Sequence, residues 1–430
     1  MSKMLLFQFL LVFLFPDRIS AQAGTLDASF GTGGELTIPV NEKFSAVEDF
    51  VIQPNGRLLI AATNGSFQTS DILLVRLYSD GTLDHSFGYL GKAIINIGER
   101  ESVSGMVLQE DRRIVVYGNL IRNDSVIGFI IRFEGDGTRD LSFGNDGIVE
   151  VAKVKNTFVN TILIQENGKL LCAGSTGWNG WVTSAILFRL NPDGSPDKDF
   201  QSGGIFYANY PQAPNSIFAL IQGPEGGFFT AGPNGKIDKY SFEVNEFNQY
   251  GVSGWGGFGK DGFVITNVKE NYSKPIAVAI LRDSQILAAG FAGQDENSDF
   301  AFVRYLPDGK IDKVFGGGIR TDDVSSNGRE DILRDFHLLE FGSFLALGSS
   351  HNGELDGTIP KTDLVLVQYY NDGSRDDSFG TAGLARISAE GKKYFRPGGM
   401  AIHPEGDIYV AGNTNSEFSK DIFVWKFKAK

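Results

Sequence analysis

The hexapeptide LDASFG at residues 26–31 determines the expected fold, because it recurs at a regular interval along the chain. It returns as LDHSFG at 83–88, DLSFG at 140–144 and DDSFG at 376–380, with weaker copies DKDF at 197–200, FG at 258–259 and DKVFG at 312–316. The phenylalanines of these copies are Phe30, Phe87, Phe143, Phe200, Phe258, Phe315 and Phe379, and successive positions differ by 57, 56, 57, 58, 57 and 64 residues. The chain therefore contains seven copies of a unit of about 57 residues.

Each repeat contains the pattern of four short strands. In the first copy, residues 35–40 alternate, 45–53 form a longer segment, 57–62 are continuously apolar, and 72–78 alternate again. Turn residues separate these segments, and no segment has a sustained helical period. A second landmark ends the apolar strand of every copy, at Ala62, Gly118, Gly174, Gly232, Gly290, Gly348 and Gly412. We expect an all-β, seven-bladed β-propeller with four antiparallel strands per blade and with both ends of the domain in adjoining strands.

The N-terminus predicts a signal peptide over residues 1–21. Lys3 precedes an apolar run from Met4 to Phe15, and small residues follow a polar break, so cleavage is expected after Ala21 or Ala23. The apolar run is too short to span a bilayer, although a membrane anchor is the alternative. We expect residues 24–430 to form a single propeller domain that is secreted or periplasmic, without membrane insertion after cleavage.

Composition excludes several classes of function. The net charge of -13 argues against binding to nucleic acid or anionic lipid, because both partners need clustered Lys and Arg. Cys172 is the one cysteine, so no internal disulfide can form, and the four histidines form no zinc-binding pattern. We expect a monomer with no cofactor and no metal.

The combined motif resembles a known family. The pattern LDxSFGxxG, the turns of QPxGK type, and the Arg-Leu strand before Asp-Gly-Ser or Asp-Gly-Thr are similar to the delta-60 repeat family of bacterial exported proteins. The resemblance implies a propeller-like repeat protein and supplies no catalytic or binding residues. The boundary between the fourth and fifth copies departs most from the pattern, with Trp255 in place of the motif Asp.

The repeated residues are predicted to be structural. The motif phenylalanines should fill the space between neighbouring sheets, and Cys172 should be a small buried residue. The motif aspartates should cap turns, with calcium binding as the less favoured alternative, so calcium should affect stability little. These aspartates are Asp27, Asp84, Asp140, Asp197, Asp312 and Asp376. A cation to pair with them is expected in the last strand, at Arg76, Arg132, Arg189, Arg304, Lys239 and Lys426, with Gln368 as a neutral variant.

Ligand contacts are expected in loops that differ between repeats. The loops joining the third and fourth predicted strands vary in length and composition, so the face that they form can be shaped for one partner. The leading candidates are Trp178 and Trp181, since exposed aromatic rings stack on sugars or anchor proteins. Further candidates are Asp295, Glu296, His351, Glu354 and Asp356.

These features favour a non-catalytic binding or scaffold protein that recognises a glycan or protein at the cell surface. One alternative is a propeller enzyme acting on polysaccharide, a glycosidase or lyase, which would need paired carboxylates or a metal cluster near the ring axis. Another is a structural component of the cell envelope without a small ligand. We expect no enzymatic activity and no catalytic residues.

Overall fold

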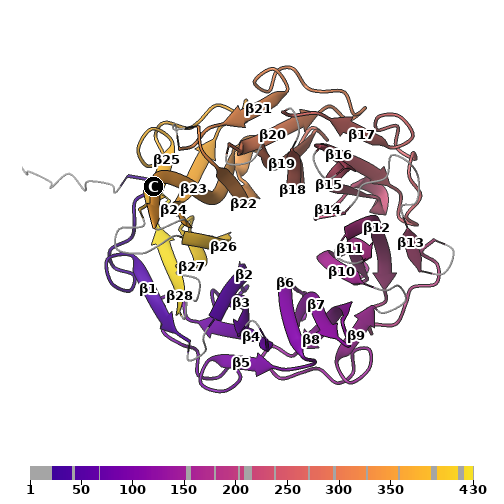
Figure 1. Cartoon of the computed structure of the whole chain (residues 1–430), viewed down its shortest axis with the longest axis vertical. Coiled ribbons are helices and arrows are strands. Elements are labelled where there is room, and N and C mark those ends of the chain that lie inside the picture. The colour runs from indigo at the N-terminus through magenta and orange to yellow at the C-terminus, as the bar shows by residue number, and fades with distance from the viewer. Residues whose placement is uncertain are drawn as a thin grey trace, which may run out of the picture.

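The chain forms a ring of seven antiparallel four-stranded sheets around a common axis (Figure 1). The computed structural model describes residues 22–429, apart from 41–43, 67, 152–155, 179–180, 202–203, 208–215, 237–238, 270–271, 294–296, 326–327, 357–358, 389–394 and 415–420. The only helices in this described part are the short 3₁₀ turns η1 (Pro224–Gly226) and η2 (Glu340–Gly342), and none is long and apolar enough to cross a membrane. The predicted seven-bladed propeller is confirmed.

Each blade is numbered along the chain from its innermost strand. The innermost strands of blades 1 to 7 are β2 (Phe44–Ile52), β6 (Arg100–Leu108), β10 (Thr157–Ile164), β14 (Ala219–Gln222), β18 (Ser273–Ile280), β22 (Asp331–Leu338) and β26 (Phe395–Ile402). The second strands are β3 (Leu58–Gly65), β7 (Ile114–Arg122), β11 (Leu170–Trp178), β15 (Phe228–Lys236), β19 (Ile286–Ala292), β23 (Phe344–Asp356) and β27 (Ile408–Thr414).

The third strands are β4 (Ser70–Leu77), β8 (Ser125–Phe133), β12 (Trp181–Leu190), β16 (Lys239–Phe247), β20 (Asp299–Tyr305), β24 (Ile359–Tyr369) and β28 (Asp421–Phe427). The outermost strands are β5 (Lys92–Ile95), β9 (Ile148–Val151), β13 (Ile205–Tyr207), β17 (Phe263–Thr266), β21 (Ile319–Asp322) and β25 (Leu384–Ile387), together with β1 (Glu35–Pro39), which completes blade 7.

The ring closes through the pairing of β1 with β28. The register runs antiparallel from Glu35 opposite Trp425 to Pro39 opposite Asp421. The buried Trp425 indole donates a hydrogen bond from Nε1 to Glu35 Oε2 at 2.8 Å. The prediction that the two ends of the domain lie in adjoining strands is therefore confirmed.

The motif residues form one repeated contact between blades. All seven motif phenylalanines are buried. In blade 1, Asp84 Oδ1 accepts hydrogen bonds from the Ser86 amide (3.1 Å) and hydroxyl (2.6 Å), and Oδ2 accepts one from Arg76 Nε (2.8 Å). The Arg76 guanidinium lies over the Phe87 ring, 4.5 Å from its centroid. The motif aspartates therefore cap turns, as predicted, and each also accepts a hydrogen bond from the side chain in the cation slot wherever the motif Asp is present.

Blade 4 corrects one prediction. In blade 3 the residue in the cation slot is Arg189, which lies opposite Leu171 on the neighbouring strand. In blade 4 the equivalent position lies opposite Phe229, and the residue there is Glu246 and not Lys239. Because Trp255 replaces the motif Asp, a cation in this slot would have no carboxylate to bind. Glu246 instead reaches the turn directly, and its Oε2 accepts hydrogen bonds from the amides of Gly256 (3.1 Å) and Phe258 (3.2 Å). Lys239 lies at the beginning of β16.

The second landmark marks a close approach of two backbones. Six of the innermost strands contain a register shift beside it, such as the shift between Val159 and Thr161 in β10. A Cβ atom placed on Gly174 would lie 1.9 Å from the Phe158 carbonyl oxygen. Glycine recurs at this position because the bulged strand leaves no room for a side chain.

Candidate functional site

The two faces of the ring differ in variability. One face, here called the variable face, carries the turns between second and third strands and the connections from each outermost strand to the next blade. The opposite face, here called the motif face, carries the LDxSFG turns. The loops predicted to bind a ligand therefore lie on the variable face. Innermost strands begin on this face, so their first residues lie near its centre (Figure 1).

Three cations and one carboxylate on innermost strands form what we call the axial cluster: Lys274 (β18), Arg334 (β22), Arg396 (β26) and Glu48 (β2). Arg396 Nη2 pairs with Glu48 Oε2 at 2.8 Å, and Nη1 donates to the Val47 carbonyl at 3.0 Å. Arg334 is electrostatically coupled to both Arg396 and Lys274. The cluster therefore spans four consecutive blades around the axis.

Lys274 and Arg334 form no direct ion pair with a described residue, although the charges of Glu48 and Glu330 attract that of Arg334. Within the part of the chain that the structure describes, neither forms an ion pair or a hydrogen bond. Burial and the positive charge of Arg334 lower the pKa of Lys274 to about 8. The ammonium group lies 3.9 Å from the centroid of the Phe218 ring, a cation–π contact. Positive charge is thus concentrated here in a chain whose net charge is -13.

Half-buried aromatic rings adjoin Lys274. Phe291 is its cross-strand partner on β19. Tyr272 packs against Phe291 (centroids 6.1 Å apart) and edge-on against Tyr240 (5.4 Å). These rings, together with Phe218, offer apolar faces beside unpaired cations.

Two carboxylates and an imidazole lie further along the same innermost strands. Asp49 (β2) accepts hydrogen bonds from the Met106 amide of blade 2, at 2.8 Å, and from its neighbour Phe50. Asp335 (β22) accepts equivalent bonds from Met400 of blade 7 and from Phe336. Burial, reinforced by the charge of Asp335, raises the pKa of Asp49 to about 6, and burial likewise raises the pKa of Asp335. His337 Nε2 lies 3.9 Å from Asp335 Oδ2.

A polar hollow on the motif face is a weaker candidate. It has a volume of about 570 Å³ and lies between the inner turns of blades 3 and 4. Its cations Lys169 and Arg189 already pair with Asp197, at 2.9 and 2.6 Å. These charges stabilise the blade contact, so they are not available to a ligand.

The predicted site residues are only partly described. Strands β11 and β12 extend to Trp178 and Trp181, which pair with each other, but their side chains lie outside the described part of the structure. Asp295 and Glu296 also lie outside it, as does the side chain of Asp356. These contacts stay predictions.

In blade 6, the segment expected to be a long loop is largely a β-hairpin. Strands β23 and β24 pair as far as Asp356 opposite Ile359. His351 is buried within this hairpin, and its Nδ1 accepts a hydrogen bond from the Gly353 amide at 2.8 Å. Glu354 is exposed and pairs with Lys361 at 2.9 Å. Among the described atoms, the structure therefore does not bring His351 and Glu354 together into one open site.

The axial cluster was missed in the sequence because its members come from different repeats. Lys274 and Arg396 each precede a proline, Pro275 or Pro397, at the same register position of β18 and β26. When the repeats are aligned at this position, the fifth and seventh copies have a cation, whereas the first and second copies have Ala46 and Ser102. This difference is the signal in the sequence that could have identified the cluster.

A protein-family profile, described as a beta-propeller domain of unknown function (DUF5122), matches residues 53–87, 165–200 and 281–315. Each match ends at a motif phenylalanine, in blades 1, 3 and 5. The match supports a propeller repeat family. No curated protein matches the chain.

Solved structures with a similar fold include lyases. An ulvan lyase of polysaccharide lyase family PL25 aligns with a TM-score of 0.55 at 10% identity, covering 92% of this chain and 96% of that chain. The same type of lyase bound to a -[GlcA(1-4)Rha3S]- saccharide gives 0.53 at 9% identity, with the same coverage. A catalytically inactive virginiamycin B lyase from Staphylococcus aureus, with quinupristin, gives 0.51 at 10% identity and covers 91% and 98% of the two chains. These similarities concern the fold.

The prediction that the chain is not an enzyme is corrected by these neighbours. It assumed that an enzyme would show its motif in the sequence, whereas solved propellers with a similar fold include lyases. It also assumed that no paired carboxylates lie near the axis, and the structure places Asp49 and Asp335 there. The lack of a recognisable motif therefore does not argue against catalysis.

Proposed function

We propose that the chain is a propeller of the delta-60 repeat type that binds an acidic carbohydrate at the axial cluster on its variable face. Lys274 and Arg334 would bind carboxylate or sulfate groups, and the adjoining rings of Phe218 and Tyr272 would stack against sugar faces. The predicted contacts Trp178 and Trp181 belong to the same face and would extend the site outward.

The observation that carries the proposal is the pair of unpaired cations. Burial, together with repulsion by the nearby Arg334, disfavours the charged form of Lys274 in the unliganded protein, as its lowered pKa indicates. In the motif contacts, by comparison, each arginine has its own carboxylate. An anionic ligand would relieve this repulsion, and the aromatic rings favour one that also has an apolar face.

The test is calorimetric titration of the full chain with a polyuronate, a sulfated polysaccharide and a neutral glucan. We expect the acidic polymers to bind and the neutral one not to bind. Arg334→Gln and Lys274→Met should each weaken binding by about ten-fold, since each removes one charge-assisted contact. Lys310→Met is the matched control, because Lys310 is exposed on the motif face and pairs with Asp308.

The pH dependence provides a second readout. With a pKa of about 8, Lys274 is mostly charged at pH 7 and mostly neutral at pH 9, so affinity should fall as pH rises through that range. Lys274→Arg should remove this dependence. Equal binding of acidic and neutral polymers, or unchanged binding by Arg334→Gln, would contradict the proposal. Release of an unsaturated uronate during the titration would show that the protein also cleaves the bound polymer, as a lyase does.

A further inference from the structure

The surroundings of Lys274 suit a neutral amine as well as a cation. Lys274 lies on an innermost strand, β18, and is half-buried. The nitrogen lies 3.9 Å from the centroid of the half-buried Phe218 ring, and the ring of Phe291 is opposite Lys274 on β19. Within the described part of the chain, no carboxylate or carbonyl oxygen accepts a bond from this nitrogen. The charged form therefore lacks the charge-assisted hydrogen bond that stabilises most buried lysines.

Arg334 adds a permanent positive charge beside this amine. It belongs to β22 of the next blade, and its charge acts on Lys274 across the blade contact. The charges of Glu48 and Glu330 attract that of Arg334, and its guanidinium keeps its proton at any physiological pH. Of the two neighbouring cations, Lys274 is therefore the one that can lose its charge. An amine that loses its proton near neutral pH is a nucleophile.

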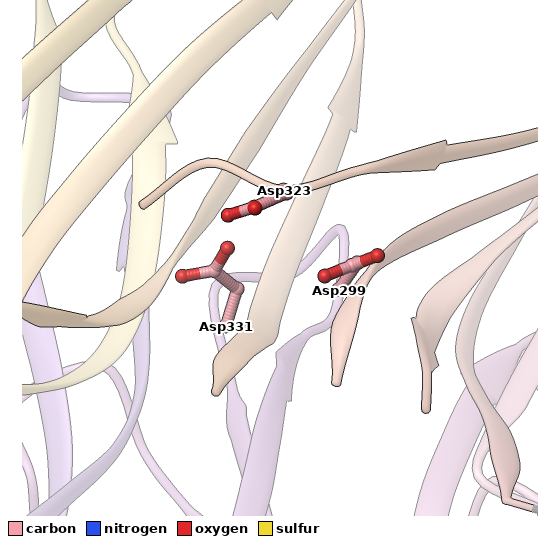
Figure 2. Close-up of side chains that lie close together, drawn as sticks. All are labelled: Asp299, Asp323 and Asp331. Atoms are coloured by element: carbon pink, nitrogen blue, oxygen red, sulfur yellow. The ribbon is translucent and has the colours of Figure 1, made fainter. Parts of the chain in front are cut away.

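Lys269 provides a comparison within the same part of the chain. It precedes Lys274 by five residues and is also half-buried. Its ammonium group pairs with Asp299, one of three aspartates that converge between blades 5 and 6: Asp299, Asp323 and Asp331 (Figure 2). The two lysines thus have similar exposure and differ in whether a carboxylate binds the nitrogen.

The reaction open to such an amine is imine formation with an aldehyde or ketone. The nitrogen lone pair forms a bond to the carbonyl carbon, and the carbonyl oxygen takes up two protons and leaves as water. No oxidant or reductant is required. The adjoining rings of Phe218 and Phe291 limit the access of water, which would hydrolyse the imine. Arg334 favours a carbonyl compound that also has a carboxylate, since a guanidinium binds that group well.

We propose that Lys274 forms a reversible imine with an aldehyde or 2-oxo acid whose carboxylate binds Arg334. The open-chain form of a uronic acid at the reducing end of a saccharide belongs to this class. The inference goes beyond the binding of acidic polymers, because a charged Lys274 is sufficient for that binding and a neutral one is needed here. Each of the two proposals can therefore fail without the other.

The experiment is trapping of the imine in the full chain with glyoxylate and cyanoborohydride, which reduces the imine to a stable secondary amine. Peptide mass spectrometry then gives the rate at each lysine. At pH 7 an amine with a pKa of about 8 is neutral in about one molecule in ten, against fewer than about one in a thousand for an ordinary lysine. We expect Lys274 to react at least about ten-fold faster than Lys269.

The pH profile separates a nucleophilic amine from one that is merely accessible. Lys310 is the exposed control, because it is 79% exposed and its pKa is raised by a hydrogen bond to Asp308. The rate at Lys274 should level off above about pH 9, whereas the rate at Lys310 should still rise at pH 10.

Acetaldehyde, which has no carboxylate, tests the role of Arg334. The ratio of the rates at Lys274 and Lys269 should be higher with glyoxylate than with acetaldehyde. Arg334→Gln should reduce the glyoxylate ratio by about ten-fold, since it removes both the anion contact and the neighbouring charge. Arg334→Lys should restore part of it.

Three results would overturn the proposal. They are a rate at Lys274 no higher than at Lys269, a Lys274 rate that still rises at pH 10, and equal ratios with the two aldehydes. All three are measured in the unsubstituted protein, so they do not depend on the folding of a variant. Binding of a polyuronate in the calorimeter without trapping of glyoxylate would remove this proposal and leave the carbohydrate site standing.

Discussion

At the scale of single residues, Arg132 shows how a buried cation can be structural. Its Nε donates to Asp140 Oδ2 at 2.7 Å, and Nη1 donates to the Pro192 carbonyl in the next blade. Its guanidinium lies 4.6 Å from the centroid of Phe143. Arg334 has none of these partners among the described residues, and this difference separates the candidate binding residue from the repeated contact.

Phe143→Ala should therefore destabilise the ring strongly. The substitution leaves a cavity between blades 2 and 3 and removes the ring beneath Arg132. We expect the free energy of unfolding to fall by about 3–5 kcal/mol in a urea titration. Leu141→Ala, at an exposed position of the same motif, should change it by less than about 0.5 kcal/mol. Similar values for the two variants would show that the aromatic ring does not fill the blade contact.

At the scale of the strand, the bulge of the innermost strand determines which residue the paired second strand can have opposite it. The bulge brings the Phe158 carbonyl against Gly174, and glycine occupies the equivalent position in every blade except blade 1. Blade 1 has Ala62 opposite Val47, so its bulge leaves room for one methyl group. The same bulge presents Arg334 and Glu48 in the axial cluster.

Gly174→Ala should be destabilising although alanine suits a strand at least as well as glycine does. The added Cβ would lie 1.9 Å from the Phe158 oxygen, so β10 or β11 must move. We expect a loss of about 1–3 kcal/mol in the free energy of unfolding. Ala62→Gly is the reciprocal control and should cost only about 0.5–1 kcal/mol, from chain entropy. A neutral Gly174→Ala would show that the bulge adjusts freely.

At the scale of the whole molecule, stability depends on closing the ring. Blade 7 takes its outermost strand β1 from the other end of the domain. The Gly24 amide donates to the Lys428 carbonyl at 2.9 Å, so the segment before β1 already adjoins the segment after β28. Phe30 and Ile38 pack in the core shared by blades 7 and 1.

Deleting residues 22–40 should therefore destabilise the protein far more than transferring this segment to the other end of the chain. The deletion exposes the edge of β28 and the core around Phe30, so we expect a lower melting temperature and aggregation by light scattering. A circular permutant that begins at residue 41 and carries residues 24–40 after Lys430 retains every strand pair. It should melt close to the parent protein. A deletion variant as stable as the permutant would show that β1 contributes nothing to closure.

The sequence by itself determined the number of blades, the order of their strands, the motif contacts and the closure of the ring. These features depend on short-range patterns repeated in every copy, such as Asp84 capping the turn at Ser86, two residues away. The tertiary structure decided the rest. It placed Glu246 in the slot expected for Lys239, because one strand register determines which side chain reaches the turn. It also brought together Lys274 with Arg334, and Asp299 with Asp331, since contacts between different blades depend on the curvature of the ring and on the bulges of its innermost strands.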